Sequence, residues 1–418
     1  MTDGLRDLVE GNAPCYVYDR DEVVRRCRGL RSAMPGVRFL YSLKANPFPP
    51  LVEAAAAEGF GADASSSGEV LRALECGIAP GDVFYSSPGK TDVDISRAAG
   101  RCTVIADSLH EMELLDACAC ASGSGMRVGI RVNPSFGMGA GGPSPSRFGV
   151  DEDRLGDLLG RVRRMRGVEI TGIHVHLRSQ VLDAEVLSRY YRDVYALAER
   201  VSEEHGADIR FVNFGSGLGT VYDPASESPA DMALLSRTMA DIAARNRAGL
   251  RADLIVETGR YVACSAGTYY ARVVDVKESM GVRYAVVDGG MGGFLRPALA
   301  GMMRSACPGA PGMEPLFTCC REAPVSVPWP GSEETEMVTV VGNLCSAMDV
   351  LAEDVELPRL RIGDIVAISN AGSYARTLSP LLFADQRQPG EFMWGRESRS
   401  GPVYSKTPRS VGLLRFPL

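Results

Sequence analysis

The stretch YSLKANPFPP, residues 41–50, places a single lysine, Lys44, between a short apolar run and prolines that cannot continue a strand. A lysine taken alone is usually a solvated surface charge. At the end of a strand and fixed by the prolines, however, its amine would lose hydration and could form a Schiff base. The stretch therefore suggests a carbonyl cofactor, and on these residues alone the surface-charge interpretation stays open.

A glycine-rich stretch, NFGSGLG at 213–219, could bind the anionic group of such a cofactor. Gly215 and Gly217, on either side of Ser216, would let backbone N–H groups approach an anion between a strand and the next helix. A tight turn without a ligand explains the same glycines equally well. The stretch is therefore a candidate phosphate cradle only together with other residues.

The stretch ETGR contains Glu257 and, three residues on, Arg260. A carboxylate beside a pyridine nitrogen would keep that nitrogen protonated, and the guanidinium would bind a phosphate or a carboxylate. These are the requirements of a pyridoxal phosphate site. A surface ion pair is the alternative if the stretch is considered alone.

His174 and His176 are two residues apart in a predicted strand, so they share one of its faces. A metal would need a third ligand, which the sequence does not offer, and we predict no metal site. Either histidine could also be a core residue. Cys345 in GNLCSAMD and Tyr374 in NAGSYA are, by themselves, best interpreted as a buried thiol and a core tyrosine.

Eight short β-rich runs alternate with helical patterns between residues 38 and about 257, which favours a (β/α)8 barrel of the α/β class over a doubly wound open sheet. The runs are RFLYS (38–42), GAD (61–63), VFYSS (83–87), TVIAD (103–107), RVGIRVN (127–133), EITGIHVH (169–176), IRFVNFG (209–215) and ADLIVE (252–257). In a barrel, functional side chains lie at the carboxyl ends of the strands. Polar residues gather there: Lys44, Asn46, Asp63, Ser86, Ser87, Asp107, Asn133, His174, His176, Asn213 and Glu257.

After residue 265 the pattern changes to alternating strand-like runs with Gly- and Pro-rich links, which predicts an all-β domain. The runs are TYYARVVDVKES (268–279), RYAVVDGG (283–290), EMVTVVGN (336–343) and DIVAISNAG (364–372), and PCYVYD (14–19) could join them. We therefore expect an N-terminal strand segment at 1–24, a cofactor-binding barrel at 25–265 and a β domain at 266–418. Two long loops stand out, at 135–149 and 307–334, and the first is a candidate lid beside the site.

The composition and net charge of the chain argue against several classes of protein. Apolar residues make up 45% and the net charge is -7, which indicates a globular protein and argues against a nucleic-acid partner. No leader or long apolar run is present, so we expect a cytoplasmic protein without a membrane partner. The 11 cysteines are irregularly spaced and are interpreted mostly as reduced core thiols.

Eight motifs, in order and at approximately the right spacing, resemble those of the fold-type III pyridoxal phosphate decarboxylases, the diaminopimelate and ornithine decarboxylase family, whose barrel is like that of alanine racemase. They are YSLKANP, GADASSSGEV, HVHLRSQ, FGSGLG, ETGR, DGGMGGFLRPAL, GNLCSAMD and AGSYA, and the resemblance covers roughly residues 12–385. It implies a barrel followed by a β domain like the C-terminal domain of alanine racemase. It also implies pyridoxal 5′-phosphate as cofactor and a homodimer with its active sites at the interface.

The resemblance also implies roles for individual residues. Lys44 would bind the cofactor covalently with support from Asp63, His176 would stack on the ring, and Glu257 would pair with the pyridine nitrogen. The phosphate would be held by Ser179, Gly215, Ser216, Gly217, Arg260 and Tyr374. Cys345 of the partner subunit would be the acid that protonates Cα. Arg296, and alternatively Arg260, would contact the substrate carboxylate.

Departures from the family pattern bear on the substrate. Diaminopimelate decarboxylases carry a glutamate directly after the cysteine, where this chain has Ser346. A tyrosine of the family is replaced by Ala300, and its MND by MGG at 291–293. A hydroxyl and a methyl cannot replace a carboxylate as partners of a buried ammonium, so diaminopimelate is a poor candidate. Arg178 replaces a glycine of the family and could face the phosphate or point outward.

The expected activity is thus decarboxylation of an amino acid or amino-acid conjugate in a biosynthetic pathway. The stretches VNPSFGMGAGGPSPSRFG and LCSAMDVL resemble the natural-product branch of the family, which includes the butirosin-pathway decarboxylase of glutamate bound to a carrier protein. A basic tail at 395–416 could dock such a carrier. The alternatives are a diaminopimelate decarboxylase, a racemase or epimerase, which Glu257 disfavours because racemases of this fold have an arginine there, and a non-catalytic cofactor-binding homologue.

Overall fold

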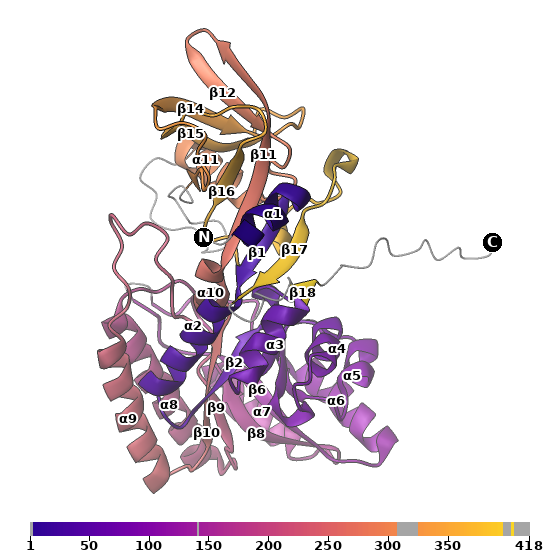
Figure 1. Cartoon of the computed structure of the whole chain (residues 1–418). Helices are drawn as coiled ribbons and strands as arrows, with labels where there is room; N and C mark the ends of the chain where they lie inside the picture. The colour runs from indigo at the N-terminus through magenta and orange to yellow at the C-terminus, as the bar shows by residue number, and fades with distance from the viewer. Residues whose placement is uncertain (1–2, 140–141, 307–324, 396–402, 405–418) are drawn as a thin grey trace, which may run out of the picture. The chain divides into compact units, whose positions relative to one another are not determined.

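The computed structural model describes residues 3–139, 142–306, 325–395 and 403–404 (Figure 1). The chain forms two compact units. The barrel unit comprises Val24–Val221 and Glu227–Val262, and the β unit comprises Met1–Val23, Tyr222–Ser226 and Ala263–Leu418.

The barrel unit contains eight parallel strands that close into a ring, which confirms the predicted (β/α)8 barrel. Closure is shown by the pairing of β10 with β2 and of β5 with β6, which an open doubly wound sheet would lack. The strands are β2 (Val37–Ser42), β3 (Gly61–Ala64), β4 (Val83–Ser86), β5 (Thr103–Ala106), β6 (Met126–Asn133), β8 (Val168–His174), β9 (Phe211–Asn213) and β10 (Asp253–Thr258). A short strand, β7 (Val150–Asp151), pairs with the end of β6.

Helices surround the barrel strands (Figure 1). They are α3 (Pro49–Ala57), α4 (Ser67–Glu75), α5 (Asp92–Ala98), α6 (Leu109–Ser122), α7 (Leu155–Val162), α8 (Ala184–His205) and α9 (Met232–Ala248). Polar side chains cap the first turns of several of them. Ser66, Ser108 and Asp183, for example, accept hydrogen bonds from backbone N–H groups of α4, α6 and α8. Along the chain, α2 (Arg20–Ala33) and α10 (Arg260–Ala263) connect the two units.

The ring of Phe211 explains two glycines inside strands of the barrel. A Cβ added to Gly172 would lie 2.2 Å from the Phe211 ring, and one added to Gly129 would lie 2.8 Å from it. The same ring packs edge-on against Phe84, with 5.4 Å between the centroids. One large side chain thus occupies the space that the glycines of neighbouring strands leave free inside the barrel.

The β unit is built on one nine-stranded sheet, as the strand-like runs after residue 265 predicted. Its strands are β1 (Cys15–Asp19), β11 (Gly267–Ser279), β12 (Val282–Val287), β13 (Val325–Ser326), β14 (Thr335–Val341), β15 (Val350–Pro358), β16 (Ile365–Ile368), β17 (Gly390–Trp394) and β18 (Val403–Tyr404). The N-terminal strand β1 joins the sheet between β11 and β17, as expected for residues 14–19. Sequence patterns missed β15, β17, and the helices α1 (Asp3–Asn12) and α11 (Leu295–Ala306).

Several expectations fall partly outside the described residues. Of the long loop at 307–334, residues 307–324 are not described, and of the basic tail only residues 395 and 403–404 are. The loop at 135–149 is described except for 140–141, and its role as a lid stays a prediction. Among the described helices, none combines the length and the apolar composition needed to cross a bilayer.

Candidate active site

Lys44 lies directly after β2, in the short 3-10 helix η1 (Leu43–Ala45), at the carboxyl end of the barrel. Its Nζ donates a hydrogen bond to Oδ2 of Asp63 at 3.1 Å, and the Lys44 side chain is 42% exposed whereas Asp63 is fully buried. The other oxygen of Asp63 accepts from Ser86 Oγ at 2.7 Å. The amine is therefore accessible to a ligand and is held by a carboxylate that Ser86 orients.

The chain contains four lysines, and the structure separates their roles. Nζ of Lys90 is buried, where it donates to the carbonyls of Ser87 and Ile105 and forms an ion pair with Glu111 at 2.9 Å. Lys277 is exposed on β11 in the other unit, and residue 406 lies outside the described part. Among the described lysines, Lys44 alone presents an accessible amine at the carboxyl end of a barrel strand, as predicted.

His176 lies just beyond β8 and is held as a neutral imidazole. Its Nδ1 accepts a hydrogen bond from the backbone N–H of Ser216 at 3.0 Å, so Nδ1 carries no proton. Nε2 then carries the proton and faces Ser179 Oγ at 3.3 Å. Burial, assisted by the positive charges of Lys44 and Arg131, lowers the pKa of His176 to about 3. A neutral ring with a fixed orientation is suited to stacking on an aromatic cofactor.

The turn at Gly215–Gly217 requires its glycines. Gly215 has a φ of 62°, and a Cβ there would lie 2.4 Å from the carbonyl oxygen of Val175. Gly217 has a φ of 148°, and a Cβ there would lie 2.9 Å from the side chain of Leu187. The Gly215 N–H donates to Asn213 Oδ1 at 2.9 Å. The turn thus needs glycine at both positions, because neighbouring protein atoms occupy the space of a side chain.

Glu257 is buried near the end of β10, where its carboxylate is ionised. Asn213 Nδ2 donates to Oε1 at 2.9 Å. Nε2 of His174 lies 3.2 Å from the same oxygen, without the angles of a hydrogen bond. Burial alone opposes the charge, but His174 and Lys44 outweigh it and hold the pKa of the carboxyl well below its usual range. Within the described part of the chain, no donor reaches Oε2.

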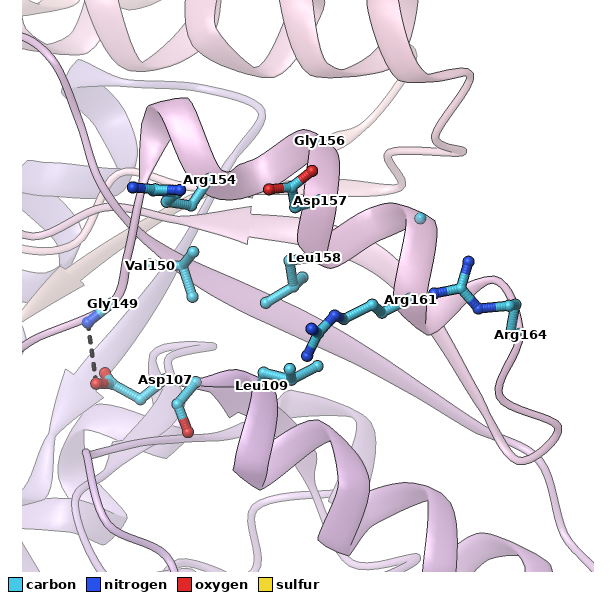
Figure 2. A pocket seen from close by; sticks show the side chains of 12 residues that line it. Asp107, Leu109, Gly149, Val150, Arg154, Gly156, Asp157, Leu158, Arg161 and Arg164 are labelled. Carbon is cyan, nitrogen blue, oxygen red and sulfur yellow. Dashed lines mark hydrogen bonds between the residues drawn. The ribbon is translucent and has the colours of Figure 1, made fainter.

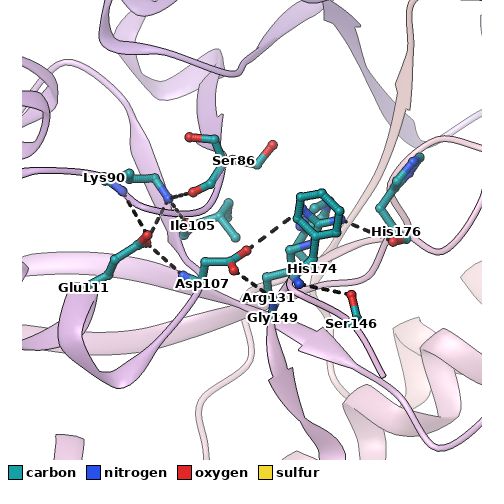
Figure 3. A network of polar contacts seen from close by, with 12 residues as sticks. Ser86, Lys90, Ile105, Asp107, Glu111, Arg131, Ser146, Gly149, His174 and His176 are labelled. Atoms are coloured by element: carbon teal, nitrogen blue, oxygen red, sulfur yellow. Dashed lines mark hydrogen bonds and ion pairs between the residues drawn. The ribbon is translucent and has the colours of Figure 1, made fainter. Parts of the chain in front are cut away.

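The structure adds Arg131, which the sequence patterns missed (Figure 3). It lies in β6, is only 8% exposed, and donates from Nη2 to the carbonyl of His176 at 3.3 Å. Its guanidinium stacks on the ring of Phe148 at 4.4 Å and lies 3.9 Å from Asp107. Burial lowers the pKa of Arg131, although Asp107 opposes the shift. An arginine within the apolar run RVGIRVN was the available signal.

The charged network continues from Arg131 away from the site (Figure 3). The backbone N–H of Asp107 donates to Oε2 of Glu111 at 2.9 Å, and the same carboxylate pairs with Lys90. Asp107 Oδ2 accepts from the N–H of Gly149, the last residue of the candidate lid, at 2.9 Å. The rim residues Ser86, Asp107 and His174 thus each lie next to a charged side chain. These side chains are Asp63, Arg131 and Glu257, respectively. Asn133 holds the loop itself, since its Nδ2 donates to Asp151 and to the carbonyl of Ser144.

A pocket of about 660 Å³ lies between α6 and α7, next to this network (Figure 2). Its lining includes Asp107 and Gly149 together with three arginines, Arg154, Arg161 and Arg164. Lys44, His176 and Glu257 are not among its lining residues, so this pocket is not the predicted cofactor site.

Four predicted site residues lie in the β unit. Arg296 is 4% exposed, with Nη1 donating to the carbonyl of Ser373 at 2.9 Å and Nη2 donating to that of Asn370. Tyr374 follows directly and has a φ of 50°. The structure therefore brings Arg296 and the Tyr374 segment together.

Cys345 and Ser346 lie in a second loop of the β unit, between β14 and β15. The Cys345 side chain is exposed, and Ser346 Oγ accepts from the N–H of Met348 at 3.3 Å. The buried carboxylate of Asp349 accepts from the N–H groups of Leu344 and Met291 and thereby fixes this loop. Asp349, in the motif GNLCSAMD, is a second residue whose role the sequence did not reveal.

The residues of the barrel unit fit pyridoxal phosphate. They provide an accessible amine, an ionised carboxylate with one open oxygen, a neutral imidazole, and a turn that requires glycine at positions 215 and 217. Arg178, whose orientation the sequence left open, is exposed. Its neighbours in the chain pair with the glycine turn, since Val181 N–H donates to the carbonyl of Gly217 at 2.8 Å.

Comparisons with known proteins agree with this geometry. Residues 20–264 match the family described as pyridoxal-dependent decarboxylase, pyridoxal binding domain. L-Glutamyl-[BtrI acyl-carrier protein] decarboxylase of Niallia circulans is 32% identical over 390 residues, 91% of this chain and 88% of that protein. Diaminopimelate decarboxylase of Methanothermobacter thermautotrophicus is 31% identical, over 88% of this chain and 84% of that protein. The crystal structure of diaminopimelate decarboxylase from Helicobacter pylori complexed with L-lysine superposes with a TM-score of 0.80 at 26% identity, covering 93% of this chain and 94% of that one.

Proposed function

Because the chain belongs to the pyridoxal-dependent decarboxylase family and is a pyridoxal 5′-phosphate-dependent carboxy-lyase acting on an amino acid, we propose that its substrate is an amino acid tethered to a carrier protein, in a secondary-metabolite pathway. L-Glutamate is the first candidate for the amino acid, since the carrier-dependent relative acts on it. The scissile group is the α-carboxylate.

The observation that carries this proposal is the serine at 346, directly after Cys345. Its hydroxyl accepts a backbone hydrogen bond from Met348 and brings no negative charge to the loop. A free diamino acid has a distal ammonium, which needs a carboxylate partner when it is buried. A tethered amino acid has no such ammonium, so a neutral residue here agrees with it.

The replacement of the family's MND by MGG also has a structural counterpart. A Cβ on Gly293 would lie 2.3 Å from the hydroxyl of Tyr269, so no aspartate fits at this position. Tyr269 is buried and donates to the carbonyl of Gly289 at 3.0 Å. The space that a polar side chain would need is thus filled by an aromatic one.

We assign Lys44 as the residue that binds the cofactor, with Asp63 holding its amine. When bound, pyridoxal phosphate supplies an electron sink for the pair released as the α-carboxylate leaves. Glu257 would hold a proton at the pyridine nitrogen through Oε2, because its own pKa is kept low. His176 would cover one face of the ring and exclude water from it.

We assign the phosphate to the Gly215–Gly217 turn with Ser179, Arg260 and Tyr374, following the resemblance. Arg260 is buried at the start of α10, which agrees with a role toward an anion inside the protein. Arg260 is also the alternative contact for the substrate carboxylate. Cys345 would protonate Cα after the carboxylate has left. Its exposed position within one chain is consistent with our proposal that it acts in the partner subunit of a homodimer.

The test is a substrate panel assayed by mass spectrometry for loss of CO2. It contains free L-glutamate, meso-diaminopimelate, glutamyl-pantetheine, and the BtrI acyl-carrier protein loaded with L-glutamate. We expect the loaded carrier to lose CO2 with the highest kcat/KM. Preferential turnover of diaminopimelate would replace the proposal by the second candidate, which the diaminopimelate decarboxylases among the relatives favour. Exchange of solvent deuterium into Cα without CO2 release would indicate a racemase.

A further inference from the structure

Arg296 was expected from the family resemblance to bind a substrate carboxylate, and its contacts within the chain indicate a further task. It is the second residue of α11, and its guanidinium is almost completely buried. Nη1 donates to the carbonyl of Ser373, and Nη2 donates to that of Asn370. Arginine binds a carboxylate through two parallel N–H groups. Here each terminal nitrogen donates one of its N–H groups to a main-chain oxygen.

The two carbonyls lie near the ends of one short turn, Asn370–Tyr374. Asn370 has a φ of 55° and Tyr374 a φ of 50°, in the left-handed region that is unfavourable for side chains other than glycine. Such residues persist only where their surroundings fix the backbone. Arg296 supplies a fixed, forked donor across the turn.

The opposite side of this turn is also fixed within the β unit. The N–H of Gly372 donates to the carbonyl of Cys264 at 3.0 Å, and that of Ala371 donates to Gly267 at 2.8 Å. A Cβ on Gly372 would lie 1.7 Å from the carbonyl oxygen of Ala263. The turn is therefore clamped between the segment at 263–267 and the guanidinium of Arg296.

Further contacts hold the guanidinium and the start of α11 in place. The Cζ of Arg296 lies 5.2 Å from the ring centroid of Tyr222 and 5.1 Å from that of Phe294. The N–H of Leu295 donates to Ser379 Oγ at 3.0 Å, and that hydroxyl donates to the carbonyl of Ala375. The first turn of α11 is thus attached to the chain on both sides of Tyr374.

We propose that Arg296 is a positioning residue: it holds the Asn370–Tyr374 turn so that Tyr374 can bind the cofactor phosphate. The inference rests on the proposed role of Tyr374 in phosphate binding. The affinity that Arg296 controls is that for pyridoxal phosphate.

The test measures binding of pyridoxal 5′-phosphate itself and so needs no knowledge of the substrate. Cofactor-free protein is titrated with pyridoxal 5′-phosphate for the wild type, Arg296→Lys, Tyr374→Phe and the double variant. Lysine keeps the charge but cannot span two carbonyls. We expect each single variant to raise the dissociation constant about tenfold, and the double variant to raise it no further, because both changes remove one interaction.

Arg361→Lys is the matched control, since Arg361 is exposed in the same unit, and its dissociation constant should equal that of the wild type. An unchanged constant for Arg296→Lys alongside a raised one for Tyr374→Phe would overturn the inference, as would additive effects. An unchanged constant for Tyr374→Phe would refute the proposed phosphate role on which it rests. If Arg296→Lys does not fold, Arg296→Gln, which can still donate to one carbonyl, takes its place in the same cycle.

Discussion

The backbone N–H of Ser216 donates a hydrogen bond to Nδ1 of His176, at 3.0 Å, and thereby joins the glycine turn after β9 to the end of β8. The bond requires an unprotonated Nδ1, in agreement with a pKa for His176 of about 3. One contact therefore fixes the tautomer, the charge and the orientation of the ring that we expect to cover the cofactor.

The first prediction concerns the protonation of His176 in the cofactor-free protein. The unfolded chain binds a proton below about pH 6.5, whereas the folded one does so only below about pH 3. Between these values the unfolded state holds more protons, so the free energy of unfolding falls as the pH falls. NMR of the labelled imidazole should show a neutral ring at pH 5, with its signal identified by its loss in the His176→Asn variant. A ring that titrates near pH 6 would contradict the structure.

The second prediction concerns Glu257. Glu257→Gln keeps the shape and an oxygen for Asn213, but it removes the negative charge that would hold a proton on the pyridine ring. We expect kcat to fall by about 100-fold or more, as when a charge-stabilising group is removed from an active site. The control is Glu169→Gln on the exposed side of β8, which should keep the wild-type rate. Equal rates for the two variants would show that Glu257 has no role in the reaction.

The third prediction concerns Lys44. Lys44→Ala should lose the visible absorbance of lysine-bound cofactor and all measurable decarboxylation, because no other described lysine presents an accessible amine at the barrel's carboxyl end. Lys277→Ala, which changes an exposed lysine of the β unit, should retain both. Reduction with borohydride followed by peptide mass mapping would locate the cofactor directly. Labelling of a peptide without Lys44 would show that the assignment is wrong.

The fourth prediction concerns the proposed homodimer. If Lys44 and Cys345 of different subunits complete one site, Lys44→Ala and Cys345→Ala proteins that are each inactive should recover activity when their subunits are exchanged. Random pairing makes half of the dimers mixed, and each mixed dimer has one intact site, so about a quarter of the wild-type activity is expected. Activity is measured after mixing and after a control incubation of each variant alone. A mixture as inactive as its parents would indicate that both residues act within one chain.

The fifth prediction concerns stability, through the buried pair of Lys90 and Glu111. Lys90→Met would leave the Glu111 carboxylate without its cation, and we expect the free energy of unfolding to fall by about 3–5 kcal/mol. Denaturant unfolding measures this, with Lys277→Met as the control, which should change it by less than about 0.5 kcal/mol. Replacing both partners, in Lys90→Met with Glu111→Leu, should restore much of the loss. A single variant as stable as the control would show that the pair is dispensable.

Much of the fold could be predicted because its signals are local. The eight barrel strands appear as short apolar runs, and they alternate with helical spacing that neighbouring residues alone determine. Strand β15, with the charged sequence VLAEDVELP, was missed because its exposed face carries acidic side chains at irregular spacing. Arg131 was missed because a charged residue within an apolar run does not disclose whether it faces water or a buried carboxylate.

The sequence by itself determined the barrel, the β domain, the family and the list of chemically capable residues, because residue type and order along the chain carry that information. Only the tertiary structure decided which of them meet: Lys44 with Asp63, Asn213 with Glu257, and Arg296 with the Tyr374 turn. It also decided which groups carry charge, since a pKa depends on burial and on neighbours that are distant in the chain. Lys44 and Lys90 are the same residue type, yet one is an accessible amine and the other a buried counter-ion.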